Sequence, residues 1–128
     1  MNSVDTIRDT DIADVLDADA LKILRSSLEI MPDAYRDVLA NFLESIPMLL
    51  TDIRAAIEAC DTKLLERAAH NLKSNSAMLG ALKLSRLAAD VEAIGESGNT
   101  DTSAIFLENM EKEYIRVKPA VLKLLSSE

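Results

Sequence analysis

Aromatic residues, cysteine and histidine are scarce in this 128-residue sequence, and tryptophan is absent. Because aromatic residues make up only 3% of the chain, its core has to be built from aliphatic side chains, a composition that favours helices. The single cysteine, Cys60, has no partner for an internal disulfide, and one histidine cannot form a Cys/His zinc cluster. We therefore expect residues 1–128 to fold as a single domain, without disulfide or metal staples.

The sequence also lacks a long apolar run and an excess of basic residues. Five aspartates precede Asp19 and no apolar run accompanies them, which excludes a secretory signal. No later segment reaches the ~18 apolar residues that a membrane span requires. The net charge of −8 and the few aromatic residues argue against nucleic acid as a partner. We expect a cytoplasmic protein without membrane contact, and Met1 followed by an acidic segment favours a free-standing one.

Apolar residues recur with a helical period along almost the whole chain, and no stretch alternates strictly as a half-buried strand would. The pattern predicts an all-α domain, an up-and-down four-helix bundle with an additional short N-terminal helix. Asp17 or Asp19 is the expected N-cap of that short helix. Residues 1–15 are expected to form a loosely ordered acidic segment.

The first two bundle helices have recognisable ends. The first should begin at Pro32, bury a stripe that runs from Tyr35 to Cys60, and be bent or split at Pro47. The second should begin near Asp61 or Thr62 and end at Leu79. Gly80 is placed to adopt the left-handed conformation that commonly follows a helix.

The last two helices are separated by the clearest loop in the chain, GESGNTD. The third helix is expected to stop at Gly95, where this loop begins. Thr100 and Asp101 are the candidate caps of the fourth helix. Pro119 should kink or break that helix.

The only histidine, His70, lies in the second predicted helix. With Leu72 at the centre of the buried face, a step of ~100° per residue places His70 about 160° away, on the exposed side. Arg67 and Lys73 flank it one turn before and one turn after. The residues at i+4 and i+7 are small, Ser74 and Ala77, so another protein surface can approach the ring closely.

An exposed histidine usually has no special role, but these neighbours suit a nucleophile. A neutral imidazole is a competent nucleophile near neutral pH. If it accepts a phosphoryl group, two adjacent cations can stabilise the charge on the phosphoryl oxygens during transfer and in the product. Lys63 adds a further positive charge on the same face. Lys83 and Arg86 either extend this patch or are ordinary solvated side chains.

The stretch AAHNLKSNSAMLGA resembles the signature of the histidine-containing phosphotransfer (HPt) domain of bacterial and plant two-component phosphorelays. Its usual form is close to A-H-x-L-K-G-S-S-x-x-[LIV]-G-A. Eight positions match at the expected offsets: Ala69, His70, Leu72, Lys73, Ser76, Leu79, Gly80 and Ala81. Two positions depart from it, Ser74 where the family usually has glycine and Asn75 where it usually has serine. Both replacements are small and polar, so they weaken the match only slightly.

The resemblance implies that His70 takes a phosphoryl group from the phospho-aspartate of a response-regulator receiver domain and passes it to another receiver. Lys73 would give electrostatic support, and Lys63, Arg67, Ser74 and Ala77 would contact the partner. The protein would need no cofactor, since the Mg²⁺ would belong to the receiver. It would be a monomeric carrier rather than an enzyme, because the sequence has no nucleotide-binding motif for autokinase activity. A hybrid sensor histidine kinase is the implied upstream partner.

Three other interpretations compete with this one. An acyl carrier protein is also small, acidic and helical, but it needs an Asp-Ser-Leu motif, and no Asp-Ser pair occurs here. A nucleophilic pair of Cys60 and His70 would require the two side chains to meet, whereas the helical pattern places them on different faces. A non-catalytic helical adaptor that binds a response regulator or another partner stays open, and an assay of phosphoryl acceptance distinguishes it.

Overall fold

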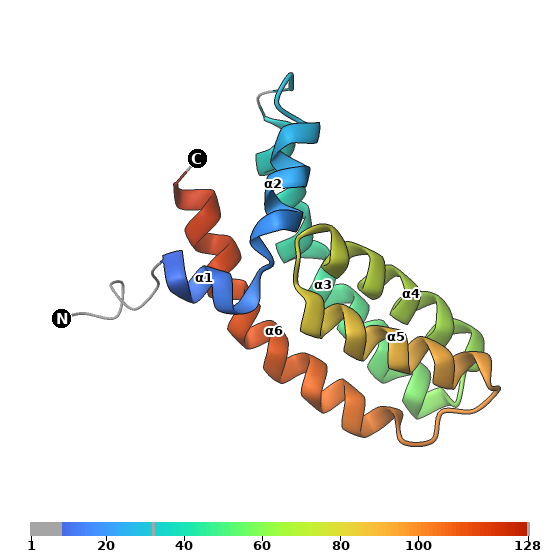
Figure 1. Cartoon of the computed structure of the whole chain (residues 1–128). Helices are drawn as coiled ribbons and strands as arrows, with labels where there is room; N and C mark the ends of the chain where they lie inside the picture. Colours follow the sequence, from blue (N-terminus) through green and yellow to red (C-terminus); the bar gives the residue numbers. More distant parts are fainter. Residues whose placement is uncertain (1–8, 32, 128) are drawn as a thin grey trace.

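The computed structural model describes residues 9–31 and 33–127, which form six α-helices (Figure 1). In chain order these are α1 (Asp9–Val15), α2 (Ala18–Ser27), α3 (Ala34–Ala59), α4 (Thr62–Met78), α5 (Leu82–Glu96) and α6 (Ser103–Ser126). Within the bundle, α4 packs on α3 and α5, and α6 closes the ring by packing on the same two helices. The predicted all-α fold with a four-helix bundle is therefore confirmed.

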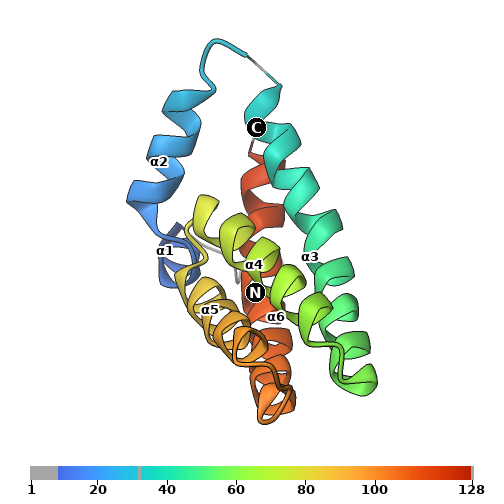
Figure 2. The same cartoon turned by 90° about the vertical axis from the view of Figure 1, so that its right-hand side faces the viewer.

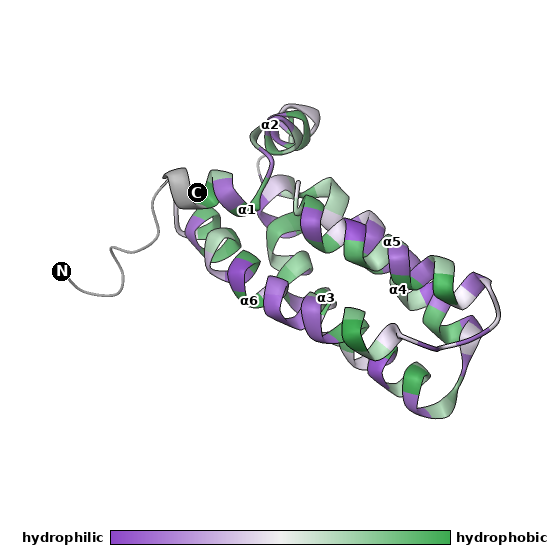
Figure 3. Cartoon of the chain, turned by 60° about the horizontal axis from the view of Figure 1, so that its bottom comes forward, coloured by the Kyte–Doolittle hydropathy of each residue, from purple (hydrophilic) through white to green (hydrophobic). Residues whose placement is uncertain are grey.

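The four helices of the bundle differ in length. Helices α3 and α6 have 26 and 24 residues, whereas α4 and α5 have 17 and 15. Figures 1 and 2 show α3 and α6 continuing past the ends of the shorter pair, with α2 beside this extension. In Figure 3 each bundle helix carries both hydrophilic and hydrophobic residues around its axis, as amphipathic helices do.

The N-terminal part of the chain differs from the sequence-based expectation. Residues 9–15, expected to be loosely ordered, form α1, and this helix packs against α6. Its Ile12 and the following Leu16 are buried in the core. Asp17 is the N-cap of α2, since its carboxylate accepts a hydrogen bond from the backbone N–H of Ala20 at 2.9 Å. The rest of the expected loose segment, residues 1–8, lies outside the described residues, as does Pro32.

Helix α3 is not split at Pro47. A proline inside a helix leaves the carbonyl four residues earlier without its usual N–H donor. That carbonyl belongs to Leu43, and the buried Tyr114 hydroxyl of α6 donates to it at 3.3 Å. The neighbouring helix thus replaces the hydrogen bond that Pro47 removes. Pro119 likewise lies inside a continuous α6, so that helix is not broken.

Cys60 is exposed, which corrects its predicted place on the buried stripe of α3. The helix ends at Ala59, and Cys60 adopts a left-handed conformation with φ 52°. Its N–H bonds to the carbonyl of Ile57, and the N–H of Asp61 bonds to that of Ala56. These two bonds form a Schellman motif, in which the left-handed residue turns away from the core.

The end of α5 and the start of α6 also differ from expectation. Gly95 lies inside α5 and is buried, so it does not stop the helix. Gly98, with φ +88°, makes the turn instead. Helix α6 begins at Ser103 with Thr102 as its N-cap, in place of Thr100 or Asp101. The loop was therefore located correctly, but its turn residues were assigned too early.

Candidate functional site

Helix α4 is held at both ends by local hydrogen bonds. The carboxylate of Asp61 accepts from the N–H of Leu64 at 3.1 Å, as an N-cap does. At the other end Gly80 has φ +77°, and the N–H groups of Gly80 and Ala81 bond to the carbonyls of Ala77 and Ser76. This second Schellman motif reverses the chain, so that α5 runs back along α4.

Gly80 also allows another segment to approach the turn. A Cβ atom at this position would lie 2.7 Å from the backbone nitrogen of Asp17, closer than packed atoms come. The N–H of Asp17 instead donates to the carbonyl of Gly80 at 2.7 Å. The turn of the α4–α5 hairpin is therefore tied to the start of α2.

The faces of α4 are those that the helical period predicts. Its buried residues are Leu65, Ala68, Ala69, Leu72 and Ser76. His70 lies on the opposite side, and 55% of its side-chain surface is exposed. The structure therefore places the only histidine on the outer surface of the shorter hairpin, within reach of a partner.

Glu92 of α5 binds both His70 and Lys73. Its Oε2 lies 2.7 Å from Nδ1 of His70, and its Oε1 lies 2.6 Å from Nζ of Lys73. The Glu92 side chain is only 13% exposed, whereas that of Lys73 is 35% exposed. One carboxylate thus connects the two residues that the sequence analysis singled out as nucleophile and electrostatic support.

The charge state of Glu92 follows from these contacts. The hydrogen bond from Lys73 is the main cause that lowers the pKa of Glu92 below its ordinary value of 4.5. Partial burial opposes this shift, and the hydrogen bond from His70 adds to it. Glu92 is therefore ionised at neutral pH, and an ionised carboxylate can only accept hydrogen bonds. It follows that Nδ1 of His70 donates and that Nε2 carries the reactive lone pair.

Close packing of α4 and α5 supports this contact. A Cβ atom at Gly95 would lie 3.0 Å from the backbone nitrogen and 3.1 Å from the Cα atom of Glu66. Glycine therefore lets the last turn of α5 lie directly against the backbone of α4. Glu92 precedes Gly95 by one turn and His70 follows Glu66 by one turn, so the same close approach brings the carboxylate to the imidazole.

The Hpt domain family model matches residues 37–120, from the first turns of α3 to the last part of α6. The chain belongs to this family. Among solved structures it is similar to the histidine-containing phosphotransfer protein B (HptB) of Pseudomonas aeruginosa PAO1, with a TM-score of 0.81 and 27% sequence identity. That likeness covers 91% of this chain and 98% of the HptB chain. No curated protein matches in a sequence search.

The other residues predicted for the Hpt site lie along the exposed side of α4. Lys63, Arg67, Ser74 and Ala77 are all exposed. Lys83 does not extend this patch. Its side chain instead approaches α6, where Nζ of Lys83 lies 3.9 Å from the buried Glu113.

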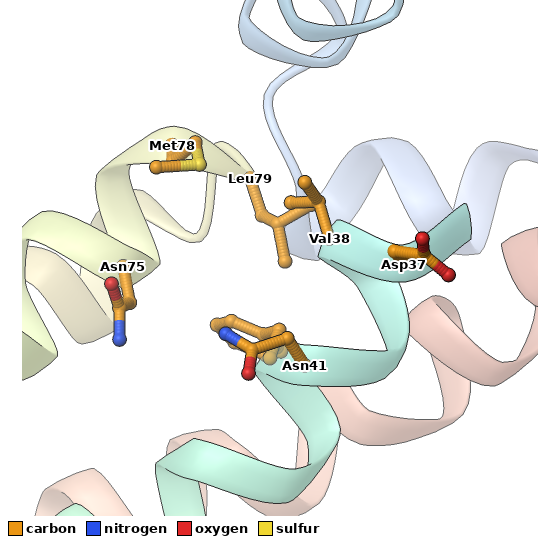
Figure 4. Close-up of a pocket in the computed structure, with 7 residues that line it drawn as sticks. Asp37, Val38, Asn41, Asn75, Met78 and Leu79 are labelled. Atoms are coloured by element: carbon orange, nitrogen blue, oxygen red, sulfur yellow. The ribbon is translucent and has the colours of Figure 1, made fainter. Parts of the chain in front are cut away.

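An apolar pocket beside α4 is lined by residues other than the histidine. It has a volume of about 340 Å³ and lies between α3 and the end of α4 (Figure 4). Phe42, Val38, Met78 and Leu79 give it an apolar lining, and Asn41, Asn75 and Asp37 lie at its edges. Enzymes that act on small molecules usually place the nucleophile in such a cleft. His70 instead stands on an exposed ridge, an arrangement suited to a protein partner that brings its own cleft.

The described part of the chain contains neither a helix suited to span a membrane nor a cluster of metal-ligating side chains. No helix there is long and apolar enough to cross a membrane. The same residues include no group of three or more His, Cys, Asp or Glu side chains placed to hold a metal ion.

The sequence analysis missed Glu92, although a signal for it exists. In an antiparallel hairpin, residues at equal distances from the turn lie at the same height. His70 precedes Ala81 by eleven residues and Glu92 follows it by eleven. Counting outward from the Gly80 turn would therefore have placed an acidic residue beside the histidine.

Proposed function

We infer that this Hpt protein is a phosphorelay intermediate, which accepts a phosphoryl group on His70 from a receiver-domain phospho-aspartate and returns it to the aspartate of another receiver. One observation carries this inference: the only histidine is exposed within the family motif, and its Nδ1 is held by an ionised carboxylate. The ring is therefore oriented with Nε2 as its nucleophilic nitrogen.

The phosphoryl transfer to His70 requires no additional base. The lone pair of Nε2 attacks phosphorus and forms the N–P bond, while the P–O bond to the receiver aspartate breaks and its electron pair stays on that carboxylate. The hydrogen on Nδ1 remains on the ring throughout, bonded to Glu92. Because no proton has to leave, His70 needs only orientation and charge stabilisation from its neighbours.

The surroundings of His70 suit a receiver domain as the partner. Receivers present an acidic pocket, and Lys63, Arg67 and Lys73 are cations on an otherwise acidic molecule with net charge −8. Lys73 supplies positive charge to the phosphoryl oxygens. Ser74 and Ala77 are small enough to let the receiver surface settle beside the imidazole. The Mg²⁺ used in the transfer belongs to the receiver.

The same proposal defines the place of the protein in a signalling chain. Hpt proteins exchange phosphoryl groups with receiver domains and kinases. We place this chain as a monomeric carrier without autokinase activity, downstream of a hybrid sensor histidine kinase.

The test is incubation with a panel of phosphorylated receivers. We expect an acid-labile, alkali-stable label on the wild type, none on His70→Gln, and the wild-type level on Asn109→Gln, a matched change at an exposed site of α6. Label retained by His70→Gln would assign the chemistry to another residue. Receiver binding without label on the wild type would favour the non-catalytic adaptor.

A further inference from the structure

Glu92 contacts the ring of His70 at the nitrogen that does not react, so its negative charge is still in place after phosphoryl transfer. We propose that Glu92 keeps the phosphohistidine in its protonated, imidazolium form and thereby makes it a strong phosphoryl donor with a short lifetime. This inference rests on the proposed function, since it concerns a phosphoryl group carried on Nε2 of His70.

The protonation state of the imidazole decides how readily the ring leaves phosphorus when a receiver aspartate attacks. In the imidazolium form Nδ1 carries a proton and Nε2 carries phosphorus. When a receiver aspartate attacks, the P–N bond breaks, its electron pair returns to Nε2, and the leaving group is a neutral imidazole. If Nδ1 had lost its proton, the leaving group would be an imidazolate anion. Departure of that anion is much harder, so a deprotonated ring holds the phosphoryl group more tightly.

The geometry of Glu92 favours the protonated ring. Nδ1 and Oε2 are 2.7 Å apart, the distance of a charge-assisted hydrogen bond. The carboxylate is mostly shielded from water, which strengthens its attraction for a positive ring. Lys73 holds its other oxygen at 2.6 Å and so keeps it ionised and in position. Of the charged groups around the ring, Glu92 of α5 contacts it, and Glu66, Arg67 and Lys73 lie one helical turn away on α4.

Lys73 offers a second route by which Glu92 acts on the phosphoryl group. Glu92 holds the Lys73 ammonium at 2.6 Å, which limits how closely this ammonium can approach the phosphoryl oxygens. Removing the carboxylate would free the Lys73 ammonium to bind the phosphoryl oxygens. The phosphohistidine would then last longer because of Lys73, and not because its ring had lost a proton. A variant of Glu92 alone does not separate the two routes, but the same variant in a Lys73→Ala background does.

The experiment phosphorylates the full chain directly with phosphoramidate, a small-molecule donor to histidine nitrogen, so that it does not depend on a receiver. The half-life of the phosphohistidine is then measured at one pH for the wild type, Glu92→Gln and the control Glu96→Gln, an exposed site on the same helix. Glutamine keeps an oxygen acceptor for Nδ1 and removes the charge. We expect an about tenfold longer half-life in Glu92→Gln, because hydrogen bonds between charged groups are that much stronger than those with a neutral partner. Glu96→Gln should match the wild type.

Three further readouts separate a charge effect from a loss of structure. Nitrogen-15 NMR of the phosphorylated ring should show a larger fraction of rings with Nδ1 protonated in the wild type than in Glu92→Gln at the same pH. Glu92→Asp, which keeps the charge, should restore a short half-life. With a phosphorylated receiver, the equilibrium should shift about tenfold toward phosphohistidine in Glu92→Gln.

The outcomes distinguish this inference from the proposed function. An unchanged half-life in Glu92→Gln, with normal folding by circular dichroism, overturns the inference. So does an effect that disappears in the Lys73→Ala background, because Glu92 would then act only through Lys73. If phosphohistidine forms with phosphoramidate but never exchanges with any receiver, the proposed function fails, whereas the half-lives still test the role of Glu92.

Discussion

At the scale of single residues, His70 differs from an ordinary surface histidine in how its ring is held. More than half of the side chain is exposed, yet Nδ1 is bound at 2.7 Å by a carboxylate whose side chain is only 13% exposed. A ring fixed in this way presents Nε2 in one direction, which reduces the orientation that a partner has to impose before transfer. Exposure and orientation are thus combined at the same residue.

Lys73 should contribute more to transfer than to folding. Lys73→Ala removes a positive charge next to the phosphoryl position, so we expect transfer from a receiver to slow by about tenfold or more. The ion pair with Glu92 is partly exposed, and its loss should lower the free energy of unfolding by less than about 1 kcal/mol. A time course of phosphoryl transfer and urea denaturation measure the two effects.

Lys118→Ala, a change at an exposed site on α6, is the matched control for Lys73→Ala. An unchanged rate would remove Lys73 from the mechanism.

Ser74 tests where the partner docks. It is exposed one turn after His70, so a large side chain there would hold a receiver away from Nε2. We expect Ser74→Leu to fold normally and to lose transfer, while labelling by phosphoramidate persists. Ser74→Gly should keep transfer and lose roughly 0.5–1 kcal/mol of stability, the cost of glycine inside a helix. Wild-type transfer by Ser74→Leu would mean that the receiver approaches from another side.

At the scale of helices, the sequence predicts which side of a helix is buried better than it predicts which side chains of two helices meet. The exposure of His70 and the burial of Leu72 depend only on the period of α4, which the apolar pattern reveals. The contact of Glu92 with His70 depends on how closely α4 and α5 approach, and that distance is set by the absence of a side chain at Gly95. In the sequence, a glycine next to a loop indicates a helix end, so the pattern does not reveal this close approach.

Cys60 illustrates a second limit of the same method. Its spacing from Ala56 continues the apolar stripe of α3, so periodicity assigns it to the core. The helix stops one residue earlier, and the left-handed conformation of Cys60 turns its side chain to solvent. A period describes residues within a helix, and it cannot show where the backbone leaves that helix.

The tolerance of α3 for Pro47 should depend on Tyr114. Tyr114→Phe removes the hydroxyl that donates to the Leu43 carbonyl and leaves this partly buried acceptor unpaired. We expect a loss of about 1 kcal/mol in the free energy of unfolding, measured by urea denaturation. Tyr35→Phe is the control, because its hydroxyl contacts a side chain of α2 and not a backbone group left unpaired by proline.

A second background tests the cause of that loss. In Pro47→Ala the alanine N–H can bond to the Leu43 carbonyl, so the hydroxyl of Tyr114 is no longer needed there. Tyr114→Phe should then cost clearly less than it does beside Pro47. An equal cost in both backgrounds would show that the hydroxyl stabilises the protein in another way.

At the scale of the whole molecule, the bundle and its N-terminal helices form one folded unit. The family match begins within α3, so α1 and α2 lie outside it. Ile12 and Leu16 nevertheless belong to the same buried cluster as the bundle core. The backbone bond from Asp17 to Gly80 ties this part of the chain to the turn between α4 and α5. The acidic composition of residues 9–17 concealed these contacts, because its few apolar side chains, Ile12, Val15 and Leu16, are separated by aspartates.

Leu16 should therefore stabilise the entire domain. Its side chain is 1% exposed, and Leu16→Ala should lower the free energy of unfolding by about 2–3 kcal/mol through lost burial and a residual cavity. Ile23→Ala on α2 removes a similar aliphatic group that is 68% exposed, and its effect should stay within about 0.5 kcal/mol. Urea denaturation followed by circular dichroism measures both. Phosphoryl transfer below the unfolding transition should be unchanged in each variant, because neither residue contacts the site. If Leu16→Ala costs no more than Ile23→Ala, α1 unfolds independently of the bundle, and the cooperative domain begins only after it.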